Sequence, residues 1–291
     1  MYVFGITGCL KDENFENDSY GIRITEIKGV AFPQTAGSPI ARDILAQTVS
    51  QTIDGPFIVL EQDVAATSDV RVKLVINNAL LSPDVLPLPA TSYTLSAMEA
   101  IIPAGKKSTQ IKITFPNATV LDATKLYGIG LSISEVTAGY KIAGNQKDIV
   151  VTFSIRNKYD GIYRMQGYHN RAPYTFPYDE PMEMRTAGTS SVIFYYLKEN
   201  SIGHPIGTGP GATSWYGNAI APVVVFDPTT DLVTSVFNNP PNSTVITMFT
   251  GAGSGVSRYD PATKKIYVYW NYNGNPLRAF FDTLTYTGPR P

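Results

Sequence analysis

Hydrophobic and polar residues alternate with a period of two in several parts of the chain. Between Val70 and Ile76, Val70, Val72, Leu74 and Ile76 alternate with Arg71 and Lys73. Because side chains of a strand point to opposite faces in turn, this pattern predicts a strand with one face in a core. Residues 111–115, 130–133 and 149–155 repeat the pattern at a spacing typical of a β-sandwich. Only residues 39–46 favour a helical turn.

Turn signals separate these segments. The chain has 24 Gly and 21 Pro, scattered along the sequence as in many short strands joined by tight turns. Residues 103–106 read Pro-Ala-Gly-Lys and predict a turn between strands. Asp227-Pro228 and Asp260-Pro261 predict two more, since Asp accepts hydrogen bonds from turn amides and Pro presets φ. Asn273-Gly274, between residues 266–272 and 277–286, predicts a hairpin.

A change in composition near residues 156–158 predicts a domain boundary. The chain has 33 aromatic residues (2 Trp, 18 Tyr and 13 Phe), of which 11 precede residue 157 and 22 follow it. We therefore expect an all-β chain with a β-sandwich domain at residues 20–156. Residues 157–291 should form an aromatic-rich antiparallel β domain that binds ligand, closed as a barrel or folded as a second sandwich.

The only cysteine, Cys9, ends the sequence Ile6-Thr7-Gly8-Cys9. An apolar residue and two small residues before Cys are typical of the end of a bacterial lipoprotein signal peptide, whose cysteine is diacylated after cleavage. Two or more acyl chains hold a protein stably at a bilayer. The alternative is a small buried apolar side chain. We expect residues 1–19 to be a signal remnant and a polar, acidic tether, with Cys9 lipidated.

Composition also excludes several classes of protein. The net charge of −1 and the absence of any Lys/Arg cluster argue against binding of nucleic acid. One Cys and two His provide neither a disulfide framework nor an obvious metal site, so we expect no metal and no cofactor. Apart from the stretch before Cys9, nothing approaches a membrane span. Contact with a membrane is therefore expected through the lipid anchor only.

Four segments carry a resemblance to a known family: residues 102–106 (IPAGK), 127–133 (YGIGLSI), 157–163 (NKYDGIY) and 282–290 (DTLTYTGPR). In their order and spacing the chain resembles a family of Bacteroidetes outer-membrane lipoproteins, from about Gly29 to the end. The resemblance implies an N-terminal immunoglobulin-like domain of unknown function and an all-β C-terminal domain, for which a lipocalin-like barrel is one expectation.

The resemblance also implies a cellular role. Members are associated with polysaccharide-utilisation loci, beside outer-membrane transporters, and are described as surface glycan-binding or cell-adhesion proteins. We therefore expect a non-catalytic, lipid-anchored protein of the outer membrane and cell surface that captures glycan, with the transporter complex as a further partner. The first alternative is an adhesion or structural protein that binds another protein. The second is a glycoside hydrolase, suggested only by relatives in which this N-terminal domain precedes glycosidase modules.

Candidate ligand-binding residues follow from the chemistry of sugars. Flat aromatic faces contact the C–H side of a sugar ring, while amides, carboxylates and Arg bind its hydroxyls. Trp215 and Tyr216 fit best, because a Gly/Pro-rich loop precedes them. Trp270 shares a strand face with Ile266 and Val268, which favours the core. The remaining candidates are Tyr272, at the Asn273-Gly274 turn, and Tyr168 and Arg171, in a segment whose pattern favours a decorated hairpin turn over a binding site.

Catalytic motifs are poorly represented. A glycosidase needs two carboxyl groups across one bond, one of them protonated, whereas Asp179, Glu180 and Glu183 lie in a Pro-flanked stretch that suggests solvated acids. Residues 251–255 (GAGSG) place Gly253 where a nucleophile elbow needs its nucleophile. His169 alone indicates a surface or hydrogen-bonded side chain. We therefore expect that the protein is not an enzyme.

Overall fold

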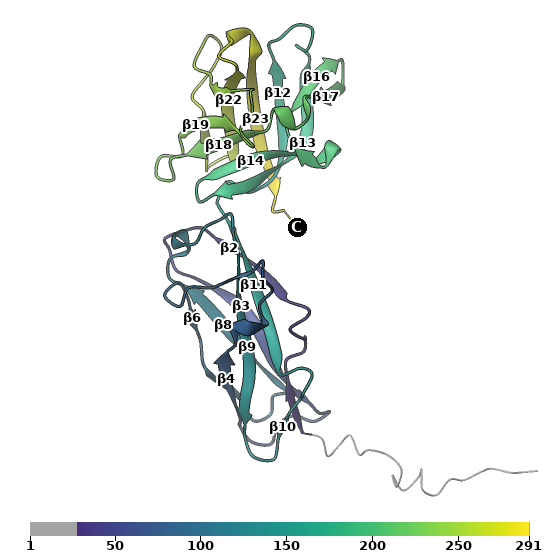
Figure 1. Ribbon diagram of the computed structural model, residues 1–291, viewed down its shortest axis with the longest axis vertical. Coiled ribbons are helices and arrows are strands. Elements are labelled where there is room, and N and C mark those ends of the chain that lie inside the picture. The colour runs from purple at the N-terminus through teal and green to yellow at the C-terminus, as the bar shows by residue number, and fades with distance from the viewer. Residues whose placement is uncertain (1–27, 291) are drawn as a thin grey trace, which may run out of the picture.

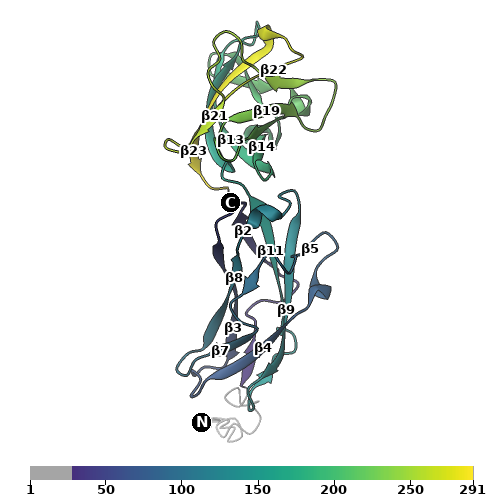
Figure 2. The same ribbon diagram turned by 90° about the vertical axis from the view of Figure 1, so that its left-hand side faces the viewer.

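The structure is a computed structural model that describes residues 28–290. Its elements are strands and short 3₁₀ turns, so the predicted all-β fold class is confirmed. Two β domains lie end to end along the long axis of the molecule (Figure 1), and a view turned by 90° gives the same arrangement (Figure 2). Cys9 and the whole of the expected tether, residues 1–19, lie outside the described residues.

The first domain is a sandwich of two sheets around one apolar core. One sheet has the order β10-β1-β3-β8-β6 and the other β2-β11-β9-β4-β7, with β5 paired to β9. The strands are β1 (Gly29–Ala31), β2 (Ile40–Leu45), β3 (Gln51–Glu61), β4 (Val70–Ile76), β5 (Leu86–Pro87), β6 (Thr94–Leu95), β7 (Glu99–Ile102), β8 (Ser108–Phe115), β9 (Leu126–Val136), β10 (Lys141–Ile142) and β11 (Asp148–Arg156). Two 3₁₀ turns, η2 (Asn78–Leu80) and η3 (Ala118–Val120), join them.

Period-two alternation in β4 is confirmed except at its end. Val70, Val72 and Leu74 are buried, while Ile76 is 47% exposed and lies outside the core. The pairing of β4 with β9 shifts register between Lys73 and Leu74, and this irregularity precedes the exposed end of the strand.

The helical turn expected at residues 39–46 is wrong. Residues 40–45 form strand β2, which pairs in parallel with β11 from Ile40 to Leu45. The segment is a sheet edge, and its ladder hydrogen bonds to a strand far along the chain override a weak local preference.

The second domain is an up-and-down antiparallel barrel. Its strands pair in the order β19-β18-β14-β13-β12-β23-β22-β20, with β15 on β14 and β21 on β22. The first strand, β12, pairs with the last, β23, which closes one seam. At the other seam, Val233 N–H donates to Ser257 O (3.0 Å) and Tyr259 N–H donates to Asp231 O (2.8 Å), which joins β21 to the start of β19. Of the two expected architectures, the structure is therefore the barrel.

The barrel is assembled from strands that follow one another along the chain. They are β12 (Gly161–His169), β13 (Pro177–Gly188), β14 (Ser191–Tyr196), β15 (Ser201–Ile202), β18 (Pro222–Phe226), β19 (Val233–Asn238), β20 (Ile246–Met248), β21 (Arg258–Asp260), β22 (Lys265–Tyr272) and β23 (Ala279–Gly288). A separate hairpin of β16 (Pro205–Gly209) and β17 (Ala212–Trp215) comes after β15 and before β18 along the chain, outside the barrel sheet. The 3₁₀ turns are η4 (Leu197–Glu199), η5 (Gly217–Ala219) and η6 (Pro276–Arg278).

The predicted turns of this domain are present. Asp227 Oδ1 accepts hydrogen bonds from the amides of Thr229 and Thr230 between β18 and β19. Asp260 Oδ1 accepts from the amide of Ala262 (3.0 Å) between β21 and β22. Asn273 and Gly274 both have positive φ (54° and 61°) and begin the connection of residues 273–278 between β22 and β23.

Charged side chains join the two domains at residues 156–160. Arg156 Nη2 lies 2.7 Å from Asp43 Oδ2, and Arg156 Nη1 donates to the carbonyl oxygen of Arg290. Arg290 in turn donates two hydrogen bonds of 2.9 Å to Asp160. The C-terminal end thus returns to the joint, as Figure 1 shows.

Candidate functional site

The six predicted binding residues fall into three places. Trp270 lies inside the barrel, while Arg171, Trp215, Tyr216 and Tyr272 gather at one end of it. Tyr168 lies on the outside of β12 and is 42% exposed. Their roles in binding therefore have to be considered separately.

Trp270 is a core residue. Its side chain is fully buried, its ring stacks on Phe280 at 4.0 Å between centroids, and its Nε1–H donates to Asp282 Oδ2 (2.8 Å). The alternation that placed Trp270 with Ile266 and Val268 is confirmed, because all three are buried. Its place among the binding candidates is therefore corrected, since a buried ring offers no face to a ligand.

Tyr272 is also buried, at 4% exposure, although its position before a turn suggested a free side chain. Its hydroxyl accepts a hydrogen bond from Arg171 Nη1 (2.7 Å), and the same guanidinium reaches Tyr216 Oη (3.4 Å). The hydroxyl hydrogen bond to Tyr272 raises the pKa of Arg171. A strand that ends at a barrel mouth can still direct its last side chain inward. The prediction of a free Tyr272, made from the adjacent turn alone, was therefore wrong.

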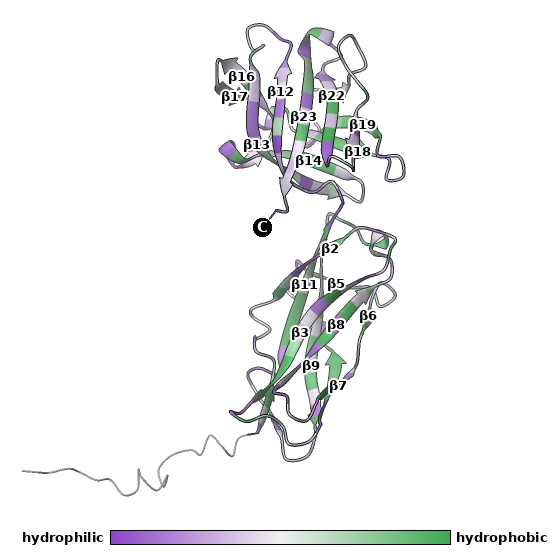
Figure 3. Cartoon of the chain, turned by 180° about the vertical axis from the view of Figure 1, so that it is seen from behind, coloured by the Kyte–Doolittle hydropathy of each residue, from purple (hydrophilic) through white to green (hydrophobic). Residues whose placement is uncertain are grey.

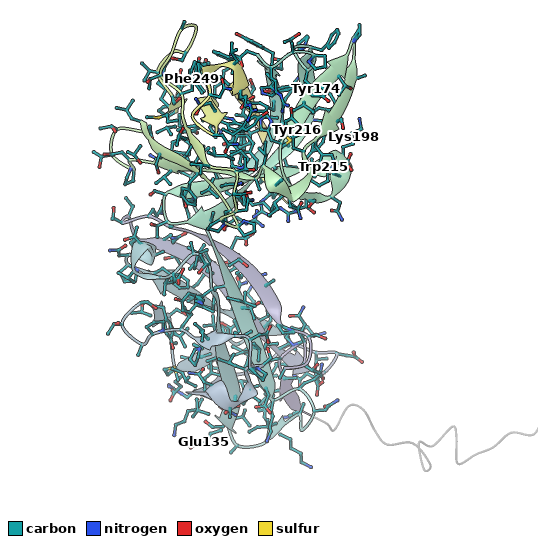
Figure 4. All side chains as sticks on the ribbon, turned by 45° about the horizontal axis from the view of Figure 1, so that its top comes forward. Glu135, Tyr174, Lys198, Trp215, Tyr216 and Phe249 are labelled. Carbon is teal, nitrogen blue, oxygen red and sulfur yellow. The ribbon has the colours of Figure 1, made fainter. Side chains whose placement is uncertain are left out.

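These residues form a cluster that closes the barrel mouth, which we call the mouth cluster: Arg171, Tyr174, Trp215, Tyr216 and Tyr272. Figure 4 shows Tyr174, Tyr216 and Trp215 on one side of the barrel, near Lys198 and away from Phe249. Trp215 ends strand β17 rather than lying in a loop, and its ring packs on Gly203, where a Cβ would approach within 2.6 Å. All five pack against one another or the core, so the cluster is chiefly a plug.

His169 lies beneath this plug. It is fully buried, stacks on Phe280 at 4.0 Å, and neither ring nitrogen has a hydrogen-bond partner among the described residues. Burial lowers the pKa of His169 to about 3, helped by the positive charges of its neighbours. The expectation of a surface or hydrogen-bonded histidine is therefore wrong.

A second buried polar group stabilises the barrel interior. Asp282 accepts hydrogen bonds from the side chains of Tyr178, Trp270 and His204, and all four side chains are buried. His204 Nδ1 lies 2.8 Å from the carbonyl oxygen of Pro205, and its Nε2 lies 3.1 Å from Asp282. Both ring nitrogens therefore face an oxygen atom. These partners satisfy the carboxylate, as a buried charge requires.

Tyr168 differs from the other candidates because it exposes an aromatic ring. It stands on the outward face of β12, stacked on Phe281 of β23 with centroids 4.7 Å apart and planes 4° apart. Phe281 pairs across the next ladder with Tyr269 of β22, at 6.0 Å between ring centroids. We call Tyr168, Phe281 and Tyr269 the aromatic row. It crosses three neighbouring strands on the outside of the barrel.

Two residues further along the same strands, polar side chains form a second row beside the aromatic row. Gln166 lies opposite Asp179 of β13 and Thr283 of β23. Gln166 Nε2 donates to Asp179 Oδ2 (3.0 Å). Arg164 donates two hydrogen bonds to the same carboxylate, from Nε to Oδ1 (2.7 Å) and from Nη2 to Oδ2. Hydrogen bonds from Arg164 lower the pKa of Asp179, so this carboxylate stays ionised. We call Asp179, Gln166 and Thr283 the polar row.

The two rows together form what we call the outer wall, the outward faces of β13, β12, β23 and β22. Figure 3 shows these four strands side by side, with hydrophilic and hydrophobic positions interspersed. A groove borders the wall where β13 meets the β16–β17 hairpin. Its lining is Gln166, Gly167, Pro177, Tyr178, Asp179, Glu180, Gly211 and Thr213. We call it the side groove.

The sequence contained part of this site. Arg164, Gln166 and Tyr168 alternate with buried Tyr163 and Met165, so a period-two analysis of residues 162–168 could have placed all three on an outward face. Their partners, Phe281 and Asp179, were not predictable, because the register between strands depends on the closure of the barrel.

Metal ligands and membrane-spanning helices were sought among the described residues. Among residues 28–290, no group of three or more His, Cys, Asp or Glu side chains could hold a metal ion. Within the same range, no helix is both long and apolar enough to cross a bilayer.

Comparisons with known proteins agree with the fold. A family model described as an N-terminal domain matches residues 46–141. A protein of unknown function from Bacteroides ovatus shares 14% identity and a TM-score of 0.58, over 90% of this chain and 95% of that one. No curated protein matches the chain in sequence. At this identity the structural likeness shows a shared fold alone.

Two more Bacteroides ovatus structures are more distant. A multidomain protein that includes a DUF1735 domain has 12% identity and a TM-score of 0.43, over 88% of this chain and 92% of that one. A protein described as a candidate carbohydrate-binding protein has 12% identity and a TM-score of 0.34, over 88% of this chain and 79% of that one. These two scores are too low to support an argument from structure.

Proposed function

We propose that the second domain binds glycan on its outer wall without cleaving it. The observation that carries this proposal is the exposed ring of Tyr168, stacked on Phe281 beside the polar row. An exposed ring can lie against the C–H face of a sugar, and amide, carboxylate and hydroxyl groups next to it can bind the sugar hydroxyls. The support of Phe281 fixes the orientation of Tyr168 before a ligand arrives, which lowers the entropy cost of binding.

Binding without cleavage is supported by the state of the acids. A glycosidase needs one carboxyl group that keeps a proton near neutral pH. Asp179, the carboxyl group of the polar row, has its pKa lowered by the two-fold contact with Arg164. An ionised carboxylate held in this way serves as a hydrogen-bond acceptor and not as a general acid.

The experiment is affinity electrophoresis of the full chain in gels that contain single polysaccharides. Tyr168→Ala should weaken retardation about tenfold, since loss of a stacked ring costs roughly 1.5 kcal/mol. Phe237→Ala is the matched control, because Phe237 is 44% exposed on β19, outside the outer wall. Equal retardation of wild type and Tyr168→Ala would refute the proposed site, and release of reducing ends would refute binding without cleavage.

We further propose that Cys9 anchors the protein to the outer membrane by lipid, at the cell surface. The support is the sequence Ile6-Thr7-Gly8-Cys9 and the acidic, polar residues that follow it. Expressed in its native host with its own leader, the protein should incorporate labelled palmitate and be digested by protease added to whole cells. A Cys9→Ala variant that still incorporates palmitate would contradict the assignment.

A further inference from the structure

We infer, resting on the proposed glycan binding, that the side groove is a second sugar subsite next to Tyr168 and that the pair of subsites selects a neutral glycan. The outer wall supplies a stacking surface, and the side groove supplies hydrogen-bonding groups. Together they would bind two neighbouring sugar units of one chain.

The two subsites are continuous across strands β12 and β13. Tyr168 lies opposite Pro177. Two residues away on the same two strands, Gln166 lies opposite Asp179. Pro177, Gln166 and Asp179 all line the side groove. Neighbouring strands lie about 4.8 Å apart, which is close to the width of a sugar ring. A glycan whose one unit covers Tyr168 would therefore place its neighbour over the side groove.

On the opposite side, a glycine-rich segment borders the aromatic row. A Cβ on Gly253 would lie 3.5 Å from the ring of Phe281, and one on Gly255 would lie 3.1 Å from Tyr269 Oη. Residues 253–255 therefore pack against Phe281 and Tyr269, the part of the aromatic row furthest from β13. Beyond Tyr168, at its other end, the aromatic row leads to the side groove. A glycan chain bound on the row would therefore extend from Tyr168 into the side groove.

The groove contains several hydrogen-bonding groups at its surface. Gln166 donates to Asp179 through Nε2, which leaves Oε1 to accept from a sugar hydroxyl. Thr213 comes from the hairpin on the other side, where its hydroxyl contacts Glu180 and lies 3.0 Å from Lys198 Nζ. The amide oxygen of Gln166 and the carboxylates of Asp179 and Glu180 can accept from the hydroxyls of a neutral sugar, and the Thr213 hydroxyl holds Glu180 in position.

The charges of the groove disfavour an anionic glycan. Its charged lining residues are Asp179 and Glu180, both acidic. The nearest bases are already engaged, Arg164 with Asp179 and Lys198 with Glu180 at 4.0 Å. Because each of these bases is paired with a carboxylate, the groove offers no unpaired cation to a uronate or sulfate, whereas a neutral sugar needs none.

The test compares wild type, Tyr168→Ala, Gln166→Ala, Thr213→Val and the control Phe237→Ala in affinity gels. The neutral probes are hydroxyethyl cellulose, xyloglucan and galactomannan, and the anionic probes are polygalacturonate and chondroitin sulfate. We expect at least one neutral polymer to retard the wild type tenfold more strongly than either anionic one. Gln166→Ala and Thr213→Val should each weaken that retardation about fivefold, and Phe237→Ala should leave it unchanged.

The outcomes separate this inference from the proposed function. Retardation by no polysaccharide would end both. Retardation that Tyr168→Ala weakens but Gln166→Ala and Thr213→Val leave intact would keep the stacking site and overturn the side groove. Strong retardation by polygalacturonate or chondroitin sulfate, lost in Tyr168→Ala, would keep glycan binding and overturn the neutral class. Thermal melting of each variant identifies a fold defect, and the exposed Gln166 provides the groove test if Thr213→Val fails to fold.

Discussion

At the scale of single residues, burial decides between ligand contact and packing. Trp270 and Tyr272 have the residue type of a sugar contact, yet both are buried, while Tyr168 on an outward strand face exposes its ring. His169 is the least satisfied buried residue of the barrel, because both ring nitrogens lack a partner among the described residues. Its stack on Phe280 is the contact that an aromatic hydrocarbon ring would make equally well.

We expect His169→Phe to stabilise the protein. Replacing an unpaired buried polar ring by an apolar ring of similar shape should raise the free energy of unfolding by about 1 kcal/mol at pH 7. The gain should grow as pH falls from 6.5 towards about 3, the native pKa. In that window the unfolded histidine binds a proton that the native one does not, which costs wild type at most about 1.4 kcal/mol per pH unit.

Urea unfolding of wild type and His169→Phe at pH 7, 6, 5 and 4 measures this difference. Far-UV circular dichroism of both proteins is the control for an unchanged fold. A variant that is less stable at pH 7, or a difference that stays constant with pH, would show that the buried imidazole has a partner.

At the scale of elements, turns set the hairpins that bring the outer wall together. Strands β22 and β23 are joined by residues 273–278, which begin with Asn273 and Gly274, both with positive φ. This hairpin aligns Tyr269 with Phe281. The aromatic row therefore depends on a connection, residues 273–278, that lies several residues away from it.

Gly274→Ala should destabilise the second domain by about 1 kcal/mol, because a left-handed backbone disfavours any residue with a Cβ. The space around Gly274 is open within 4 Å, so the effect would come from the backbone alone. Gly144→Ala is the control, as Gly144 has equally open surroundings and is not among the glycines with positive φ. Chemical denaturation of both variants measures the difference. An equal effect at the two positions would contradict the explanation.

At the scale of the whole molecule, the joint between domains determines how the barrel is presented. Arg290 contacts Asp160 with two hydrogen bonds, and Arg156 contacts both Asp43 of the sandwich and the carbonyl oxygen of Arg290. The last residues of the barrel thus connect both domains to the linker. These contacts therefore restrain the barrel relative to the sandwich.

Arg290→Ala should loosen this joint while each domain keeps its fold. Loss of hydrogen bonds to a charged partner costs roughly 1.5–3 kcal/mol. Small-angle X-ray scattering should show a broader distribution of domain separations than in wild type. Arg258→Ala, at an exposed arginine on β21, is the control. Identical scattering of all three proteins would show that other contacts hold the joint.

The part of the fold that depends on neighbours in sequence was predictable. Alternation placed Val70, Val72 and Trp270 inside, and Asp-Pro and Asn-Gly pairs located turns, because a strand's faces and a turn's dihedral angles are set by adjacent residues. The side groove could not be derived in this way, since it needs the β16–β17 hairpin to lie beside β13.

The sequence by itself therefore determined an all-β chain, its main turns and the faces of its best patterned strands. The tertiary structure decided that the second domain closes as a barrel, that Tyr272 points into the mouth cluster, and that Tyr168 meets Phe281. The physical reason is register: pairing between β12 and β23 joins segments far apart in the chain, and one residue of slip would exchange inner and outer faces.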